Sequence, residues 1–244
     1  MQKEKVVGIH AVRMLLKIRP FDVYEIYLTD INSKKFFDIL SLAKKNNIPI
    51  NKISIDKISE ISKVKSHQGI LALAKKKREI LEKDLLPFLE KKSQNHILLV
   101  LDEVSDPRNL GACLRICDAF NVSALIIKDH DSTNMNETVK KVAVGGAETI
   151  QIIKVKNISR TLELLKKNNY WVYGATGAEG EEVSDIEFNF PLVLVMGGES
   201  KGLRKKTLGN CDFRVKINML GNVECLNLSV ATGIIIHAIN SQIK

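Results

Sequence analysis

A glycine pair followed by a carboxylate is the first feature of this chain that could support chemistry. Residues 191–201 (PLVLVMGGESK) run from five apolar residues into Gly197, Gly198 and Glu199. A short apolar run closed by glycine is typical of a buried strand in a parallel sheet. The glycines would let a ligand approach the backbone, because no Cβ stands in the way. An ordinary strand-to-helix turn is an equally good interpretation of this stretch alone.

Asn109 and Arg115 lie in a second polar stretch. Asp106 is a good N-cap and Pro107 suits the first helical position, so a helix should begin there. Asn109 then lies in the first turn, where free backbone N–H groups favour anions, and Arg115 points away from the apolar stripe. The two side chains could hold a phosphate or a ribose. By themselves they fit better a capping role for Asn109 and an ion pair between Arg115 and Asp118.

Asn227 and Ser229 open the last predicted helix, and either could cap it. Residues 230–239 of that helix are apolar nearly all round. Such a helix is buried, either within its own domain or in a subunit interface. Asn227 and Ser229 would then face whatever fills the crevice at the start of the helix.

Several common catalytic and metal-binding patterns are absent from the sequence. The two nucleotide loops GxGxxG and GxxxxGK[ST], the zinc patterns HxxxH and HExxH, and the GxSxG nucleophile turn do not occur. The four cysteines, Cys113, Cys117, Cys211 and Cys225, form no CxxC pair. We therefore expect no metal, and core thiols in a reducing cytosol.

Basic residues are concentrated in the first third of the chain. Residues 1–78 hold 17 Lys and Arg against 7 Asp and Glu, which leaves 20 basic and 21 acidic residues for the rest. A basic module joined to a neutral one indicates a polyanion-binding part and a separate chemical part. A lysine-rich solvated surface is the alternative. No 18-residue apolar run and no secretory signal occur, so we expect a cytoplasmic protein without a membrane span.

Hydrophobic patterns predict two α/β units. The first should contain helices at 8–18, at 33–45 and after residue 56, and strands at 23–28, 48–53 and 70–74. The second should contain strands at 97–102, 123–128, 150–155, 171–175, 192–196 and 213–217, and helices at 85–89, 107–120, 135–144, 157–168, 203–209 and 228–241. Alternation of this kind favours a mostly parallel sheet covered on both faces. The basic run 75–78 would be either a solvated connector or a phosphate-contacting hinge.

The stretches NLGACLR (109–115), LVMGGESKGL (194–203) and LNLSVATG (226–233) resemble, in this order, the three motifs of the SpoU/TrmH (SPOUT) family of RNA ribose 2′-O-methyltransferases. VGIHAV, SHQGI, DPRNLGACLR and KKVAVGGAE resemble the bacterial 23S rRNA guanosine-2′-O-methyltransferases of that family. The resemblance extends over nearly the whole chain. It implies methylation of a guanosine 2′-OH in the peptidyl-transferase region of 23S rRNA.

The resemblance also implies a fold that periodicity does not show. Residues 85–244 would form an α/β SPOUT methyltransferase domain, a parallel sheet with a C-terminal trefoil knot. Residues 1–76 would form a small L30e/L7Ae-like RNA substrate-binding domain, with 77–84 as the linker. Patterns alone indicate a Rossmann-like sheet, since knots are rare in proteins. The family further implies a homodimer built on the knotted domain, in which Arg115 works near the cofactor of the other subunit.

Site residues follow from the resemblance position by position. The catalytic set would be Asn109, Arg115, Glu199, Asn227 and Ser229. The cofactor, S-adenosyl-L-methionine, would lie largely against backbone groups of Thr176, Gly177, Gly197, Ile217 and Leu226. A guanidinium stays protonated in proteins, so we expect a phosphate clamp at position 115 and proton loss assisted by that phosphate.

Two positions depart from the family pattern. Ser200 stands where the family usually has glycine, and Cys225 where close relatives usually have serine; both are small, so the pocket should persist. Two other functions stay open from sequence: the same chemistry on tRNA ribose, and a non-catalytic rRNA-binding assembly factor. The matching motif residues disfavour the assembly factor. The L30e-like domain that the resemblance implies disfavours the tRNA substrate, since tRNA enzymes of this family lack such a domain.

Overall fold

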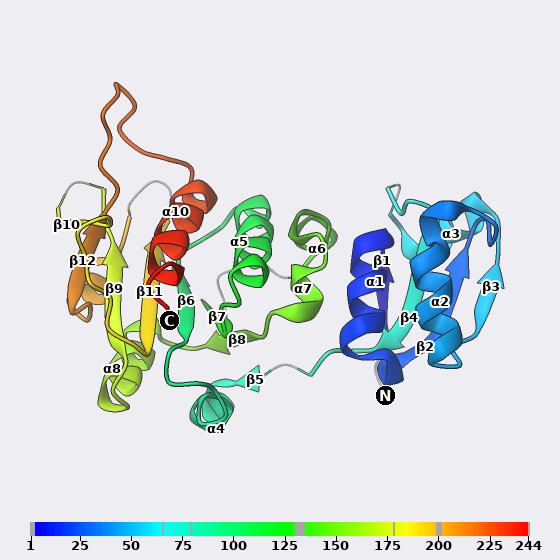
Figure 1. Cartoon of the computed structure of the whole chain (residues 1–244), viewed down its shortest axis with the longest axis horizontal. Coiled ribbons are helices and arrows are strands. Elements are labelled where there is room, and N and C mark those ends of the chain that lie inside the picture. Colours follow the sequence, from blue (N-terminus) through cyan, green and yellow to red (C-terminus); the bar gives the residue numbers. More distant parts are fainter. Residues whose placement is uncertain are drawn as a thin grey trace.

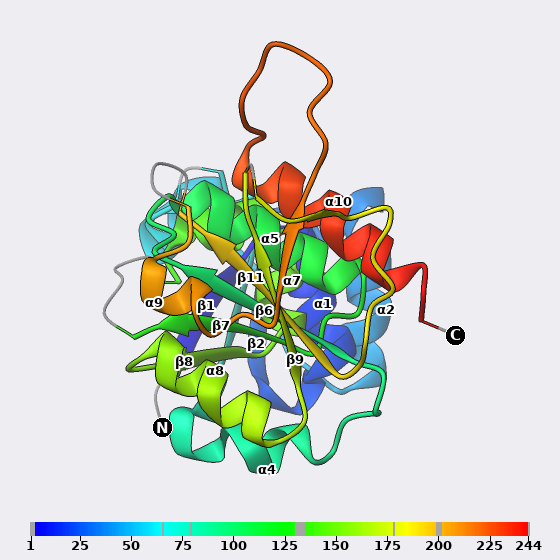
Figure 2. The same cartoon turned by 90° about the vertical axis from the view of Figure 1, so that its left-hand side faces the viewer.

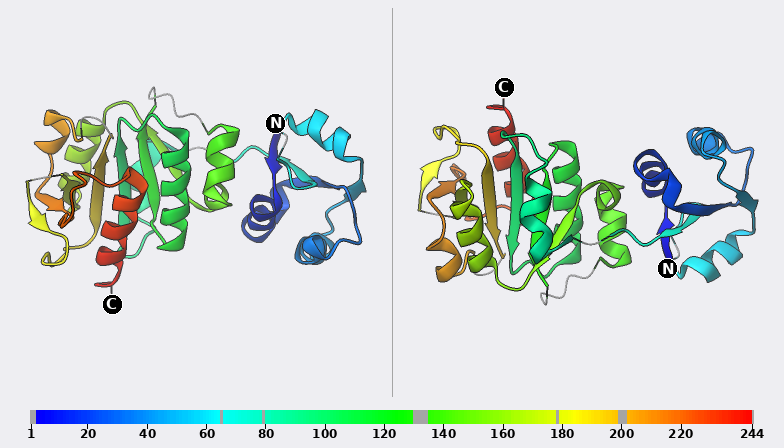
Figure 3. Two further views of the ribbon diagram at one scale, coloured as in Figure 1. Left: turned by 90° about the horizontal axis from the view of Figure 1, so that it is seen from above. Right: turned by 90° about the horizontal axis from the view of Figure 1, so that it is seen from below.

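The protein is described by a computed structural model, which covers residues 3–64, 66–78, 80–129, 135–177, 179–198 and 202–243. Two α/β units lie side by side and are joined by one connecting segment (Figure 1). Figure 3 shows the smaller unit, blue and cyan, beside the larger one from above and from below. In the described part of the chain, no helix is long and apolar enough to cross a membrane.

The N-terminal domain is a four-stranded sheet with helices. Its strand order is β1-β4-β2-β3; β4 is antiparallel to β1 and β2, while β2 and β3 are parallel. Its elements are β1 (Lys3–Val7), α1 (Ile9–Ile18), η1 (Pro20–Asp22), β2 (Val23–Leu28), η2 (Lys34–Phe36), α2 (Phe37–Lys45), β3 (Ile50–Lys52), α3 (Ile55–Ser62) and β4 (Ile70–Lys75). Strand β1 was not predicted: its charged, short sequence KEKVV has little apolar alternation and is held at the sheet edge by β4.

The second domain is an eight-stranded sheet in which every pair of neighbours is parallel. The strand order is β10-β12-β9-β11-β6-β7-β8-β5. The strands are β5 (Ile80–Leu81), β6 (Ile97–Asp102), β7 (Ala124–Lys128), β8 (Ile152–Val155), β9 (Trp171–Ala175), β10 (Glu181–Glu182), β11 (Leu192–Gly197) and β12 (Phe213–Lys216). All six residues of β11 are buried, as the apolar run 192–196 predicts, and β11 lies between β9 and β6.

Helices cover both faces of this sheet (Figure 2). They are α4 (Leu85–Leu89), α5 (Pro107–Ala119), α6 (Glu137–Ala143), α7 (Gly146–Thr149), α8 (Ile158–Lys167), α9 (Lys205–Leu208) and α10 (Leu228–Asn240), and a 3-10 turn, η3 (Glu82–Asp84), precedes α4. Helices α5 and α10 pack on one face and α4 and α8 on the other. Strand residues alternate between the two cores, because successive side chains of a strand point to opposite faces.

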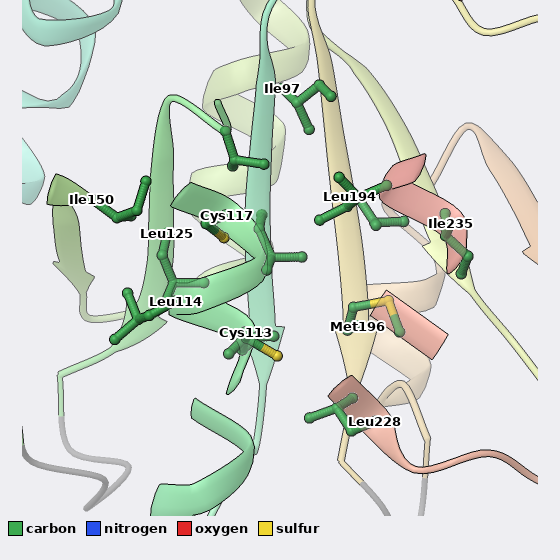
Figure 4. Packing of buried hydrophobic residues seen from close by; sticks show 14 of the residues in the cluster. Ile97, Cys113, Leu114, Cys117, Leu125, Ile150, Leu194, Met196, Leu228 and Ile235 are labelled. Atoms are coloured by element: carbon green, nitrogen blue, oxygen red, sulfur yellow. The ribbon is translucent and has the colours of Figure 1, made fainter. Parts of the chain in front are cut away.

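One hydrophobic core holds helices α5 and α10 against the sheet. Cys113, Leu114 and Cys117 of α5 and Leu228 and Ile235 of α10 pack against β6 and β11 (Figure 4). Thr232 of α10 lies within 3.8 Å of Cys113 Sγ. The starts of α5 and α10 are therefore held together above the carboxyl ends of the central strands, where parallel sheets bind ligands.

Part of the segment expected as a linker, 77–84, forms regular structure in the second domain. Strand β5 joins the large sheet by pairing with β8, and η3 follows it. Lys77 is neither a solvated residue nor a phosphate contact, because its ammonium is bound to backbone carbonyls of the second domain. The domain boundaries, the likeness to L30e and the threading of a trefoil knot stay predictions.

Candidate active site

A cavity of about 520 Å³ opens at the carboxyl ends of β9, β11 and β12. We call it the glycine cavity; its lining includes the five residues expected to hold a cofactor, Thr176, Gly177, Gly197, Ile217 and Leu226. Its size falls within the range of roughly 300–1,000 Å³ typical of small-ligand sites. The structure thus brings together residues from three strand ends and the loop before α10.

Two close backbone approaches explain why glycine occupies the turn after β11. A Cβ added at Gly197 would lie 2.2 Å from the carbonyl carbon of Gly202, and one at Gly198 would lie 2.8 Å from the Glu103 carbonyl oxygen. Both distances are shorter than any side chain tolerates. The turn therefore folds tightly against its neighbours, and one edge of the glycine cavity is backbone rather than side chain.

Asn227 joins two of the stretches singled out in the sequence, NLGACLR (109–115) and LNLSVATG (226–233). Its Oδ1 accepts hydrogen bonds from Ser229 N (2.9 Å) and Ser229 Oγ (2.6 Å) and caps α10. Its Nδ2 donates to Asn109 Oδ1 over 3.1 Å. Both amides are consequently held in one orientation, although Asn227 lies at an exposed helix start. Asn109 itself is buried at 5% exposure in the first turn of α5.

A second cavity, of about 680 Å³, adjoins the first. We call it the asparagine cavity, because Asn109 and Asn227 line it together with Asp106, Arg108, Ala112, Thr138, Lys141, Val142 and Ser229. Asn227 lines both cavities. The two cavities differ in charge: Arg108 and Lys141 contribute cations to the asparagine cavity, whereas the described lining of the glycine cavity contains no Lys or Arg.

Arg115 lies apart from both cavities. It is exposed on α5 and lines neither the glycine nor the asparagine cavity. Within the described ranges it makes no ion pair, so the Arg115–Asp118 pair weighed from sequence does not form. Its guanidinium is therefore available to an anion from outside this chain. Glu199, the remaining catalytic candidate, and Ser200 lie outside the described residues.

The cysteines divide into core and site positions. Burial raises the pKa of the Cys113 thiol to about 12 and that of Cys117 well above its usual value. Burial also raises the pKa of the half-buried Cys211 to about 12. These three remain protonated thiols. Cys225 differs from the expectation of a core thiol: it is exposed and lines the glycine cavity, because the loop that carries it extends away from the sheet.

The model of the SpoU rRNA methylase family matches residues 96–237, and that of the RNA 2′-O ribose methyltransferase substrate-binding domain matches residues 5–80. The first match alone covers more than half of the chain. The chain belongs to the SpoU family.

Curated relatives match over almost the whole length. The 23S rRNA (guanosine-2′-O-)-methyltransferase RlmB of Pseudomonas putida is 39% identical over 235 residues, 96% of this chain and 94% of its own. The protein of the same name from Escherichia coli is 38% identical over 232 residues, 95% of each chain.

Solved structures agree on the fold. The SpoU methyltransferase AviRb of Streptomyces viridochromogenes, crystallised in complex with the cofactor AdoMet, superposes with a TM-score of 0.79 at 18% identity. The match covers 98% of this chain and 90% of that one. A putative TrmH-family RNA methyltransferase from Porphyromonas gingivalis gives a TM-score of 0.76 at 22% identity, over 98% and 89% of the two chains.

Three features of this SpoU site were missed by sequence reasoning. Arg108 and Lys141 line the asparagine cavity, and Arg204 binds Asp102, which is fully buried at the end of β6, through Nε at 3.2 Å to Oδ2. Asp102 ends an apolar strand, and a carboxylate at that position could have been recognised in the sequence as a candidate site residue. Lys141 carries no such signal, because only the packing of α6 against α5 brings it to the cavity.

Proposed function

We propose that this chain methylates the ribose 2′-OH of a guanosine in the peptidyl-transferase region of 23S rRNA, with S-adenosyl-L-methionine as methyl donor. The observation that carries the proposal is the junction of two cavities at Asn227. A methyl donor and a ribose must meet in line, so adjoining cavities of different chemistry suit the reaction. The relatives from P. putida and E. coli are named as 23S rRNA (guanosine-2′-O-)-methyltransferases.

The glycine cavity fits the cofactor. It is lined mostly by glycine and apolar residues, and the described lining offers no cation to repel a sulfonium. Glu224, in the same lining, adds a negative charge. Thr176, Gly177, Gly197, Ile217 and Leu226 would hold the cofactor, largely through backbone groups. S-adenosyl-L-methionine supplies, when bound, a methyl group activated by a sulfonium.

The asparagine cavity would take the target nucleotide. Asn109 and Asn227 would orient the ribose, and Ser229 would keep the Asn227 amide fixed through its two hydrogen bonds to Oδ1. Arg108 and Lys141 would bind phosphates beside the ribose, since cations there contact a polyanion. Glu199 belongs to the proposed catalytic set on its place in the sequence motif.

Arg115 would clamp the target phosphate. Its guanidinium makes no ion pair in the described part of the chain, and a guanidinium is an anion-binding group and a poor base. The 2′-OH must lose its proton during transfer, and the clamped phosphate would assist that loss. Because Arg115 lines neither cavity of its own chain, this role fits a site completed by a second copy.

We propose a homodimer formed through the second domain. Val230 and Ile234 of α10 are 49% and 40% exposed, while Ile235, Ile236 and Ile239 are buried in the core. Val230 and Ile234 thus leave an exposed apolar surface on α10, next to the exposed His237, and an isologous contact with a second copy would cover it. The same dimer would bring the partner's Arg115 toward the cavities. We place the protein in the cytoplasm, where rRNA is modified.

The basic first domain would hold the rRNA. Nearly all of the chain's excess positive charge lies there, and this region matches the substrate-binding family model. The experiment that tests the function compares 23S rRNA from the parent strain and from a strain lacking this gene. One 2′-O-methylguanosine in the peptidyl-transferase region should disappear and return on complementation. Loss of a tRNA methylation instead would overturn the 23S assignment.

A further inference from the structure

A buried group of charges connects the two domains. Arg19, which follows α1, donates from Nη2 to Glu4 Oε1 at 2.5 Å and to Glu148 Oε2 at 2.6 Å. The Arg19 side chain is 12% exposed and that of Glu148 is 4% exposed. Glu4 and Arg19 belong to the N-terminal domain, whereas Glu148 belongs to α7 of the second domain. The Arg19–Glu148 ion pair therefore crosses between domains in a place that water hardly reaches.

Lys77 of the connecting segment binds to both sides. Its Nζ donates to the carbonyl oxygens of Ala147, Glu148 and Ile150 at 3.2, 2.9 and 2.8 Å. An ammonium has three donors, so these acceptors occupy all of them. The backbone N of Lys77 donates to Glu4 Oε1 at 3.1 Å. The segment between the domains is thus bound at a fixed place rather than left as a loose tether.

Backbone packing supports these polar contacts. Helix α1 lies against α7, and a Cβ added at Gly145 would be 2.7 Å from Met14 Cγ. On its other side α7 touches the helix that carries the first motif. A Cβ at Gly146 would be 2.7 Å from the Leu114 carbonyl oxygen and 3.2 Å from the Arg115 backbone N. One short helix therefore contacts both the N-terminal domain and the backbone of Arg115.

A cleft of about 910 Å³ lies between the domains, and Gly145, Ala147 and Glu148 at these contacts are part of its lining. Lys5 and Lys63 line it from the N-terminal domain, and Lys140 and Lys141 line it from α6. Lys141 also lines the asparagine cavity, so the cleft and the proposed nucleotide site share this lysine. Three sequence stretches, VGIHAV, SHQGI and KKVAVGGAE, contribute residues to the cleft, and the third also lines the asparagine cavity through Lys141 and Val142.

We propose that Arg19, Glu148 and Lys77 are positioning residues, which fix the N-terminal domain over the second domain so that RNA held by the first presents its ribose to the Asn109–Asn227 site. This inference rests on the proposed function. The three residues touch neither substrate nor cofactor in this account. They act through the orientation of the two domains. A fixed orientation matters for the rate of methyl transfer, because displacement of a reactant by about 1 Å can lower a rate by about 100-fold.

The test compares the full-length wild type with Arg19→Ala and Lys77→Met, and with Arg13→Ala as the matched control. Arg13 pairs with Asp38 at 3.4 Å inside the N-terminal domain, so its loss removes the same charge without touching the interface. Small-angle X-ray scattering reports the spread of interdomain distances. Calorimetry gives the affinity for S-adenosyl-L-methionine, and single-turnover assays at saturating rRNA give the rate.

In Arg19→Ala and Lys77→Met we expect a broader interdomain distance distribution, unchanged cofactor affinity, RNA affinity within a few fold, and a rate lower by about 10- to 100-fold. Arg19→Lys should recover part of the rate, and Arg13→Ala should match the wild type. Variants whose domains separate while the rate is kept would overturn the proposal, and so would variants whose domains stay fixed. An inactive wild type would refute the proposed function instead.

Discussion

Asn227 Nδ2 donates a hydrogen bond to Asn109 Oδ1 over 3.1 Å, although the two residues are 118 positions apart in the chain. The bond joins the starts of α5 and α10 above the carboxyl ends of the central strands. It also lies where the two cavities meet. A side chain that is shared by two cavities and fixed by three hydrogen bonds is suited to hold two reactants in one geometry.

Asn227→Ala should reduce methyl transfer at least about 100-fold, since the ribose loses its orienting amide. The substitution also removes an N-cap, which costs about 1 kcal/mol of stability. Asn157→Ala is the control for that cost, because Asn157 caps α8 through Arg160 N at 3.1 Å, far from the site in sequence. The melting temperature should fall by a similar amount in both variants, whereas activity should fall only in Asn227→Ala. Equal activity of the two variants would remove Asn227 from the site.

Arg115→Ala should abolish methylation and leave the affinity for S-adenosyl-L-methionine within a few fold. The guanidinium is exposed and lines neither cavity, so the cofactor should not sense its loss. Arg160→Ala removes an exposed arginine from the N-terminal turn of α8 and serves as the control. Turnover near the wild-type value in Arg115→Ala would exclude the phosphate clamp.

Gly197→Ala should weaken cofactor binding strongly and destabilise the domain by about 1–3 kcal/mol, because the new methyl group would overlap the Gly202 backbone. Gly221→Ala is a matched change in the loop before α10, where an added Cβ meets no atom within 4 Å. Calorimetric titration with S-adenosyl-L-methionine should separate the two variants. Normal affinity in Gly197→Ala would show that the turn does not shape the cofactor cavity.

Lys77 gives a dependence of stability on pH. Burial lowers its pKa from 10.5 to about 8, although the negative charge of Glu148 acts to raise it. Between these two values the unfolded chain retains a proton that the folded chain has lost, so the free energy of unfolding rises with pH. Between these two pH values, the free energy of unfolding of the wild type should therefore increase by roughly 3 kcal/mol relative to that of Lys77→Met. Denaturant titrations of both proteins check it, with Lys76→Met as the control; a constant difference would contradict the lowered pKa.

The oligomeric state follows from the exposed apolar side of α10. Val230→Glu with Ile234→Glu should give monomers of low activity, since both side chains point out of the domain core. Mixing Arg115→Ala and Asn227→Ala subunits should restore part of the activity if each site uses two chains. If light scattering gives the active wild type a molar mass of 27.3 kDa, the mass of a single chain, that result would contradict the dimer.

Much of the second domain could be predicted from sequence, because buried parallel strands are continuous apolar runs with clear ends. β6 and β9 have the predicted bounds, and the caps of α5 and α10 lie at Asp106 and Asn227 as their residue types indicate. The five expected cofactor residues line one cavity. Their grouping came from family resemblance, since nothing in local pattern says which strand ends meet.

What sequence could not supply depends on contacts between distant segments. β5 has only two residues and exists because β8 offers it an edge. Helix α7 has four residues and was missed for the same reason: it is defined by packing on α1 and α5. Lys77 belongs to a basic run that pattern alone assigns to solvent or phosphate, and only the fold brings three carbonyl oxygens to it.

Methyl transfer in a purified system tests the central claim most directly. The protein is incubated with S-adenosyl-L-methionine carrying a deuterated methyl group and with 23S rRNA transcribed in vitro, and the digested nucleosides are analysed by mass spectrometry. We predict one deuterated 2′-O-methylguanosine per 23S rRNA molecule, located in the peptidyl-transferase region, and none with Asn227→Ala. Label on a base, label on tRNA alone, or no label with a protein that binds the cofactor would contradict the account.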